Sequence, residues 1–155
     1  MGMEECWKNG GDASALLLRH VKPNFSSVFT LMQRFFDEKF KDYMGINLYK
    51  YPFNKERGYS IIKQGNIEIF IYQLERLNEV YHSIFDFLGV SGDKLIMGNT
   101  AGEKWYYPYY KKAMSGIEIS RDYFETCYNS EGLHHFYSDD DINKFRGRWM
   151  KNIKD

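Results

Sequence analysis

The chain has 155 residues, and 21 lysine and arginine residues balance 21 aspartate and glutamate residues. This length suits one domain rather than two, and the lack of a basic excess argues against nucleic-acid binding. Hydrophobic residues make up 43% and aromatic residues 18%, which indicates a folded domain whose rings could form a core or a platform for sugars.

Two helices are expected at the start of the chain. Asp12 can cap a short helix over residues 13–20, which Pro23 would end. Between residues 25 and 43 apolar side chains recur at helical spacing, which predicts a helix with one apolar face. Gly45 follows as a plausible stop for that helix.

Residues 59–63 and 67–73 are rich in strand-forming side chains. Gln64, Gly65 and Asn66 lie between them, which is typical of a hairpin turn. The second run is apolar on nearly every residue, as expected for a central strand that is buried on both faces.

An amphipathic helix is expected over residues 77–88, with Gly89 as its stop. Residues 94–97 could form a short strand after it. Residues 67–97 would then be a strand–helix–strand unit, which normally belongs to a parallel sheet.

Helices are expected in the last third of the chain. Residues 103–114 predict one that Pro108 forces to start late or kink, and Ser120 predicts another that runs to about Tyr128. Ser138 begins a final helix. The sequence therefore predicts an α/β fold, mostly helical with a small two- to three-stranded sheet, in a single domain over residues 1–155.

Cysteine usage and the N-terminal sequence indicate the compartment. Cys6 and Cys127 lie far apart and lack metal-ligand spacing, which favours free thiols in a reducing cytosol. The N-terminal stretch lacks the pattern of a signal peptide, and no window approaches the roughly 20 apolar residues of a transmembrane helix. We expect a cytoplasmic protein without a transmembrane segment.

Two histidines precede a cluster of aspartates near the C-terminus. His134, His135 and residues 139–141 could form a metal site, or the aspartates could stabilise a helix start capped by Ser138. Adjacent histidines in an extended segment point in opposite directions, which is poor for chelation. We favour the capped helix and no metal, and one histidine could still act as a general base or bind an anion.

Two further positions could carry chemistry. Glu75 follows the apolar strand, where open α/β sheets place their sites, although a carboxylate there equally suits a helix start. Lys104 and Trp105 follow a glycine-containing loop and could hold a phosphate and stack a base. Spacing alone favours a helix start with an aromatic core and a solvated lysine at that point.

Several stretches of the chain together resemble a known family. They are IFIYQLERLNEVYHSIFDFLGV, GINLYKYPFNKERGYSII, EKWYYPYY and HHFYSDDDINKFRGRW. Their order between about residues 35 and 149 resembles the family of capsular polysaccharide synthesis proteins, which is sulfotransferase-like.

The resemblance implies a P-loop sulfotransferase-like fold and a reaction. The reaction would transfer a sulfo group from 3′-phosphoadenosine 5′-phosphosulfate to a sugar hydroxyl of a surface polysaccharide. The sequence lacks the phosphate-binding loop of such enzymes, so we expect it to be the C-terminal portion of the fold or a shortened relative, incomplete or inactive as a transferase. The resemblance makes Lys104 and Trp105 candidates for the nucleotide, and Tyr106 and Tyr137 candidates for the acceptor.

Glu75, His134 and His135 complete the set of candidate residues, with catalytic roles.

Two alternative functions are consistent with the same sequence features. A non-catalytic carbohydrate-binding module would use the aromatic residues around Trp105 to bind sugar rings. An interaction module would complete its small sheet with another chain.

Overall fold

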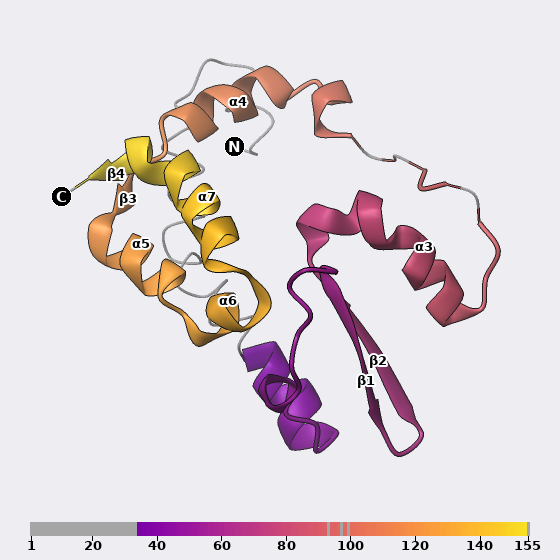
Figure 1. Ribbon diagram of the computed structural model, residues 1–155. Coiled ribbons are helices and arrows are strands. Elements are labelled where there is room, and N and C mark those ends of the chain that lie inside the picture. The colour runs from indigo at the N-terminus through magenta and orange to yellow at the C-terminus, as the bar shows by residue number, and fades with distance from the viewer. Residues whose placement is uncertain (1–33, 93, 97, 99, 155) are drawn as a thin grey trace.

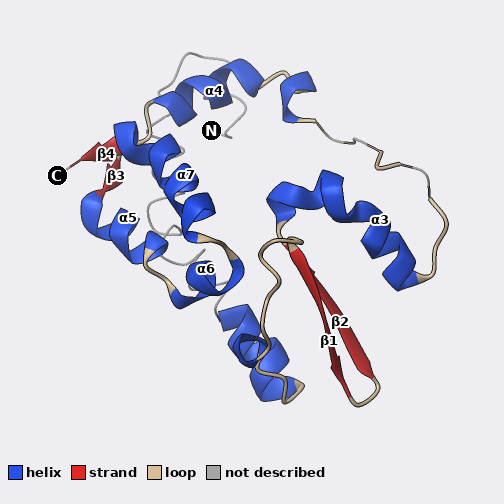
Figure 2. Cartoon of the chain, viewed as in Figure 1, coloured by secondary structure: helices blue, strands red, loops and turns tan. Residues whose placement is uncertain are grey.

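The computed structural model describes residues 34–92, 94–96, 98 and 100–154 (Figure 1). The helix expected over residues 13–20 and the first part of the one expected over residues 25–43 lie outside the described residues. Helices dominate, and the strands form two small sheets (Figure 2). The elements are η1 (Phe36–Tyr43), η2 (Leu48–Lys50), β1 (Tyr59–Gln64), β2 (Ile67–Tyr72), η3 (Leu74–Arg76), α3 (Leu77–Leu88), η4 (Ala101–Glu103), α4 (Tyr107–Ser115), β3 (Ile119–Ser120), α5 (Arg121–Tyr128), α6 (Glu131–Phe136), α7 (Asp139–Trp149), η5 (Met150–Asn152) and β4 (Ile153–Lys154).

The hairpin expected between the two apolar runs is confirmed. Strands β1 and β2 pair antiparallel, and the register from Tyr59↔Tyr72 to Gln64↔Ile67 leaves a two-residue turn. Gly65 takes a φ of +59° in that turn, a conformation that costs glycine little because it has no Cβ.

The prediction that β2 lies centrally in a parallel sheet is wrong. Among the described residues β2 pairs with β1 alone, and 94–96 form no strand, while Met97 lies outside the described residues. The apolar sequence of β2 is explained by contacts on its two faces. Ile69 and Ile71 pack on one side against the core cluster of Ile46, Leu48 and Ile62, and the ring of Phe70 lies 5.3 Å from that of Phe87 in α3. A helix and the core cluster therefore contact the middle of the strand on its two faces, while Ile67 and Tyr72 at its ends are exposed.

The helix stops and caps follow the sequence closely. Gly89 ends α3 with a φ of +63°, and Pro108 falls in the first turn of α4, where a missing N–H costs nothing. Ser138 caps α7 in a capping box with Asp141, as expected. Ser120 is the residue before α5, but its side chain makes no capping hydrogen bond.

Two features were not expected from the sequence. Helix α6 occupies the segment of the two histidines, so their side chains leave a helix and not an extended strand. Strands β3 and β4 form a short parallel pair beside which the buried amide of Asn152 donates to the carbonyl of Ile117 at 2.7 Å. That contact holds the C-terminal segment against the residues between α4 and β3.

Much of the aromatic content serves packing. The ring of Phe136 contacts those of Phe36, Tyr49 and Phe53 at centroid distances of 5.8, 6.1 and 5.2 Å, which joins η1, η2 and the following loop to α6.

Cys127 is a buried free thiol whose pKa is raised by burial. No helix in the described part of the chain has the length and apolar character needed to cross a membrane.

Candidate functional site

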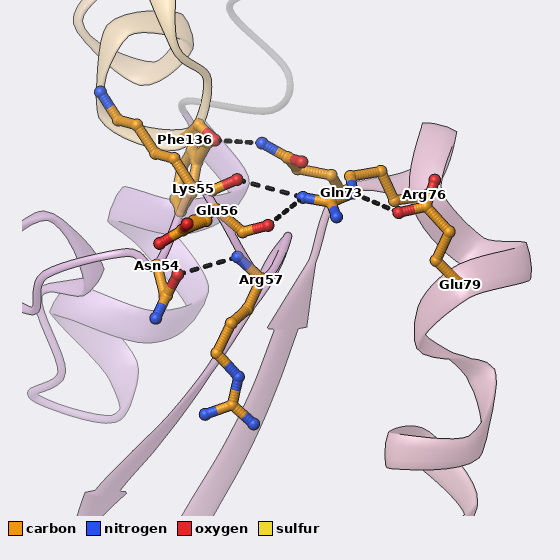
Figure 3. Close-up of polar contacts among 8 residues, drawn as sticks. All are labelled: Asn54, Lys55, Glu56, Arg57, Gln73, Arg76, Glu79 and Phe136. Carbon is orange, nitrogen blue, oxygen red and sulfur yellow. Dashed lines mark hydrogen bonds and ion pairs between the residues drawn. The ribbon is translucent and has the colours of Figure 1, made fainter.

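The loop between Pro52 and Gly58 is fixed to the end of β2 by one arginine. Nη1 of Arg76 donates to the backbone carbonyls of Lys55 at 3.2 Å and Glu56 at 2.5 Å, and its Nε pairs with Glu79 at 2.7 Å (Figure 3). Gly58 has a φ of +74°, and a Cβ there would lie 2.8 Å from Cδ of Arg76. The loop therefore needs glycine both for its backbone and for the approach of the arginine.

Two side chains from this region hold the last turn of α6. The buried Gln73 donates from Nε2 to the carbonyl of Phe136 at 2.6 Å, and Nζ of Lys55 donates to the carbonyl of His134 at 2.7 Å. Carbonyls at the end of a helix have no partner within the helix, so these donors satisfy them. The contact joins the hairpin to the C-terminal helices at one point.

Tyr137 and Glu75 meet at this junction. The hydroxyl of Tyr137 donates to Oε2 of Glu75 at 2.8 Å. The pKa of Tyr137 is raised, chiefly by burial and then by its hydrogen bond to Glu75. The phenol therefore stays protonated and donates, which orients the carboxylate, and Glu75 itself is exposed to solvent. An oriented, accessible carboxylate can accept a hydrogen bond or a proton from a ligand hydroxyl.

The two histidines have different surroundings. The side chain of His134 is exposed, and its Nδ1 lies 3.7 Å from Oδ1 of Asp139. His135 is half-buried with its ring 5.4 Å from that of Tyr49, and burial lowers its pKa while a hydrogen bond to the Tyr51 backbone acts in the opposite direction. His135 therefore belongs to the aromatic packing, and His134 is the more accessible of the two.

Lys104, Trp105 and Tyr106 form the turn before α4. The side chain of Trp105 is half exposed, and its ring meets that of Tyr106 edge-on at 5.7 Å. Figure 1 shows α4 at the opposite end of the molecule from the β1–β2 hairpin. The structure thus divides the residues expected to form a site into two separate groups. It pairs Glu75 with Tyr137, and it places the two histidines in the adjoining helix α6, where the carbonyl of His134 is bonded by Lys55.

Sequence reasoning missed the residues that build this junction. Gln73 and Arg76 flank Glu75 on either side, and Lys55 and Gly58 lie in the loop KERG. The signal that could have found Gln73 and Arg76 is the cluster of polar residues around Glu75 directly after an apolar strand. Its partners could not be found from sequence, because they lie about 20 and 63 residues away along the chain.

The described residues contain no group of three or more His, Cys, Asp or Glu side chains placed to hold a metal ion. In particular, Ser138 and Asp141 satisfy each other in the capping box, and Asp139 and Asp140 are exposed at the start of α7.

The comparisons with known proteins identify the family. The chain belongs to the NKWYS family, described as putative capsular polysaccharide synthesis protein, whose model matches residues 16–138. The family expected from the sequence is thereby confirmed, and the matched range includes Glu75, Lys104, Trp105 and Tyr137. No curated protein and no solved structure gave a match.

Proposed function

We propose that this chain binds the acceptor glycan in capsular polysaccharide synthesis, with Glu75 receiving a hydrogen bond from a sugar hydroxyl. The observation that carries the proposal is the exposed carboxylate of Glu75 held by the Tyr137 hydroxyl at 2.8 Å. The arginine-pinned loop and the amide of Gln73 hold the surrounding backbone in place. A carboxylate of fixed orientation is a strong acceptor for hydroxyl groups, which sugars present in abundance.

The resemblance to sulfotransferases suggests a reaction for the sugar hydroxyl bound by Glu75. Its oxygen would attack the sulfur of 3′-phosphoadenosine 5′-phosphosulfate, the bond from sulfur to the phosphate oxygen would break, and Glu75 would take the hydroxyl proton. The nucleotide contacts proposed at Lys104 and Trp105 belong to the turn before α4, which Figure 1 shows at the opposite end of the molecule from the hairpin. Donor binding at that turn is therefore a separate prediction from the role of Glu75.

Glycan binding is therefore the part of the function that the geometry supports best, and sulfo transfer is a separate question with its own assay. The purified chain is incubated with ³⁵S-labelled donor and capsular oligosaccharides, and label in the glycan is counted. Glycan binding is measured in parallel by titration calorimetry without nucleotide.

Glu75→Gln is the test variant and Glu68→Gln, an exposed carboxylate on the hairpin, is its matched control. We expect Glu75→Gln to weaken glycan binding by about fivefold or more, since a charge-assisted hydrogen bond becomes a neutral one. Equal binding by both variants would overturn the role of Glu75. Label in the glycan with the wild type and Glu68→Gln, but not with Glu75→Gln, would establish sulfo transfer that needs Glu75. Glycan binding by the wild type without any label in the glycan would show a binding protein without transferase activity.

Two further expectations stay predictions. Completion of the β1–β2 sheet by another chain would be seen as a complex in light scattering after size exclusion, and a stable monomer would contradict it. A cytoplasmic location would be tested by fractionation of cells that make the full protein.

A further inference from the structure

A groove lies on the other side of the loop that forms the junction. The loop and strand β1 enclose a cavity of about 360 Å³ with the buried side chain of Ile62 among its lining residues. Cavities from about 300 Å³ upward are the usual size of small-molecule sites. None of the described residues that line the groove is acidic. Its lining includes Tyr51, Pro52, Asn54, Arg57, Tyr59 and Ile62.

Arg57 supplies a fixed positive charge in this groove. Its guanidinium lies 4.5 Å over the ring of Tyr59, and Nη2 contacts the Tyr59 hydroxyl. The Tyr59 ring in turn stacks on Phe70, with centroids 4.9 Å apart and planes within 10°. The guanidinium is thus held by stacking before any ligand arrives.

In the described part of the chain, Arg57 also lacks the paired carboxylate that Arg76 and Arg146 have. Arg76 pairs with Glu79 and Arg146 pairs with Glu125, whereas Arg57 has no ion pair with any carboxylate of the described residues. Figure 3 shows its side chain extending away from the contacts of Arg76 and Gln73. A stacked guanidinium without a counter-charge can offer its N–H pairs to a carboxylate in two parallel hydrogen bonds.

The remaining lining provides one amide donor and apolar surface. Oδ1 of Asn54 accepts the backbone N–H of Arg57 at 2.9 Å, and its Nδ2 has no partner among the described residues. The hydroxyl of Tyr51 donates to Gln64 at 2.8 Å, which fixes that ring as one wall. Aromatic and proline faces suit the C–H surface of a sugar ring.

We propose that this groove binds a hexuronic acid unit of the acceptor polysaccharide, its carboxylate on Arg57 and its ring against Tyr51 and Pro52. The one cation among the described lining residues balances the single charge of a carboxylate but only half the charge of a doubly charged phosphate. The inference rests on the proposed function only in taking a glycan as the ligand. It adds the sugar class that the protein selects.

The experiment uses the full chain and a matched pair of probes. Tetragalacturonate carries one carboxylate on every ring, and its methyl ester has the same rings without charge. Binding of both is measured by titration calorimetry at fixed ionic strength. Arg57→Gln is the test variant, and Lys50→Gln removes one exposed positive charge nearby without touching the groove lining.

We expect the wild-type chain to bind tetragalacturonate at least tenfold more tightly than the ester, and Arg57→Gln to remove that preference. Lys50→Gln should change the affinity by less than twofold. Equal affinity for acid and ester, equal weakening by both variants, or no binding at millimolar probe would each overturn the proposal.

A second substitution separates this inference from the proposed function. Glu75→Gln should leave the preference for the acid over the ester unchanged, because Glu75 does not line the groove. Loss of the preference in Arg57→Gln with weaker binding in Glu75→Gln supports both sites. An intact preference in Arg57→Gln overturns the groove alone, and equal affinity of Glu75→Gln and wild type overturns the Glu75 site alone.

Discussion

The hydroxyl of Tyr137 donates a 2.8 Å hydrogen bond to the carboxylate of Glu75, across 62 residues of chain. The bond joins the residue after α6 to the residues after β2. Its acceptor faces solvent, whereas its donor is half-buried and has a raised pKa, chiefly because of burial. The pair is therefore both a link between two segments and a way of orienting an exposed carboxylate.

Removing the Tyr137 hydroxyl should lower the free energy of unfolding only slightly, and the loss should come from its hydrogen bond to Glu75. We expect Tyr137→Phe to lower the free energy of unfolding by about 0.5–1 kcal/mol, because the carboxylate can turn to water instead. Urea denaturation measures the effect, and Tyr43→Phe, at a position that is 85% exposed, is the control. In a double-mutant cycle with Glu75→Gln the two losses should not add, and full additivity would show that the pair is not coupled.

The buried amide of Gln73 should matter much more. Gln73→Ala removes the donor to the Phe136 carbonyl at the end of α6 and leaves that carbonyl without its partner. We expect a loss of about 1–3 kcal/mol in the free energy of unfolding, measured by urea denaturation. Asn78→Ala, at an exposed position in α3, should change it by less than about 0.5 kcal/mol. Similar losses in both variants would contradict the role of the Gln73 contact.

Two glycines should respond in opposite directions to alanine. Gly58 has a φ of +74° and no room for a Cβ beside Arg76, so Gly58→Ala should destabilise by about 1–2 kcal/mol or more. Gly147 lies within α7, and a Cβ added there would meet no atom within 4 Å, so Gly147→Ala should stabilise by roughly 0.5–1 kcal/mol. Thermal unfolding of both variants measures the difference. A neutral Gly58→Ala would show that the loop can release Arg76 without cost.

His135 should make stability depend on pH. Its pKa is lowered in the folded state, chiefly by burial, so the folded protein binds that proton less readily than the unfolded chain does. Unfolding then takes up a proton, and stability should fall as the pH drops below about 6.5, the ordinary value for histidine. The fall should level off below the folded-state pKa.

The measurement is the free energy of unfolding in urea between about pH 7.5 and 5.5. His135→Asn should flatten the dependence, and His134→Asn, at an exposed position, should keep it. A dependence that survives in His135→Asn would assign it to other groups.

Local signals in the sequence determined the hairpin turn, the helix stops and the last capped helix. Gly65, Gly89 and Ser138 each act within a few residues of themselves, so their effect is written in the neighbouring sequence. The family could also be read from the order of its motifs, which the match to residues 16–138 confirms.

The tertiary structure alone decided the place of β2 and the composition of the junction. The apolar run in β2 has the same pattern whether strands flank it or a helix and a core cluster contact its faces, so the pattern predicts a central strand where the structure has a hairpin strand. Lys55, Gln73 and Tyr137 meet only because the chain folds back over 62 to 79 residues to satisfy the end of α6. Contacts of that range depend on packing and not on neighbours in sequence, which is why the sequence proposed Glu75 and Tyr137 separately and the structure showed that they pair.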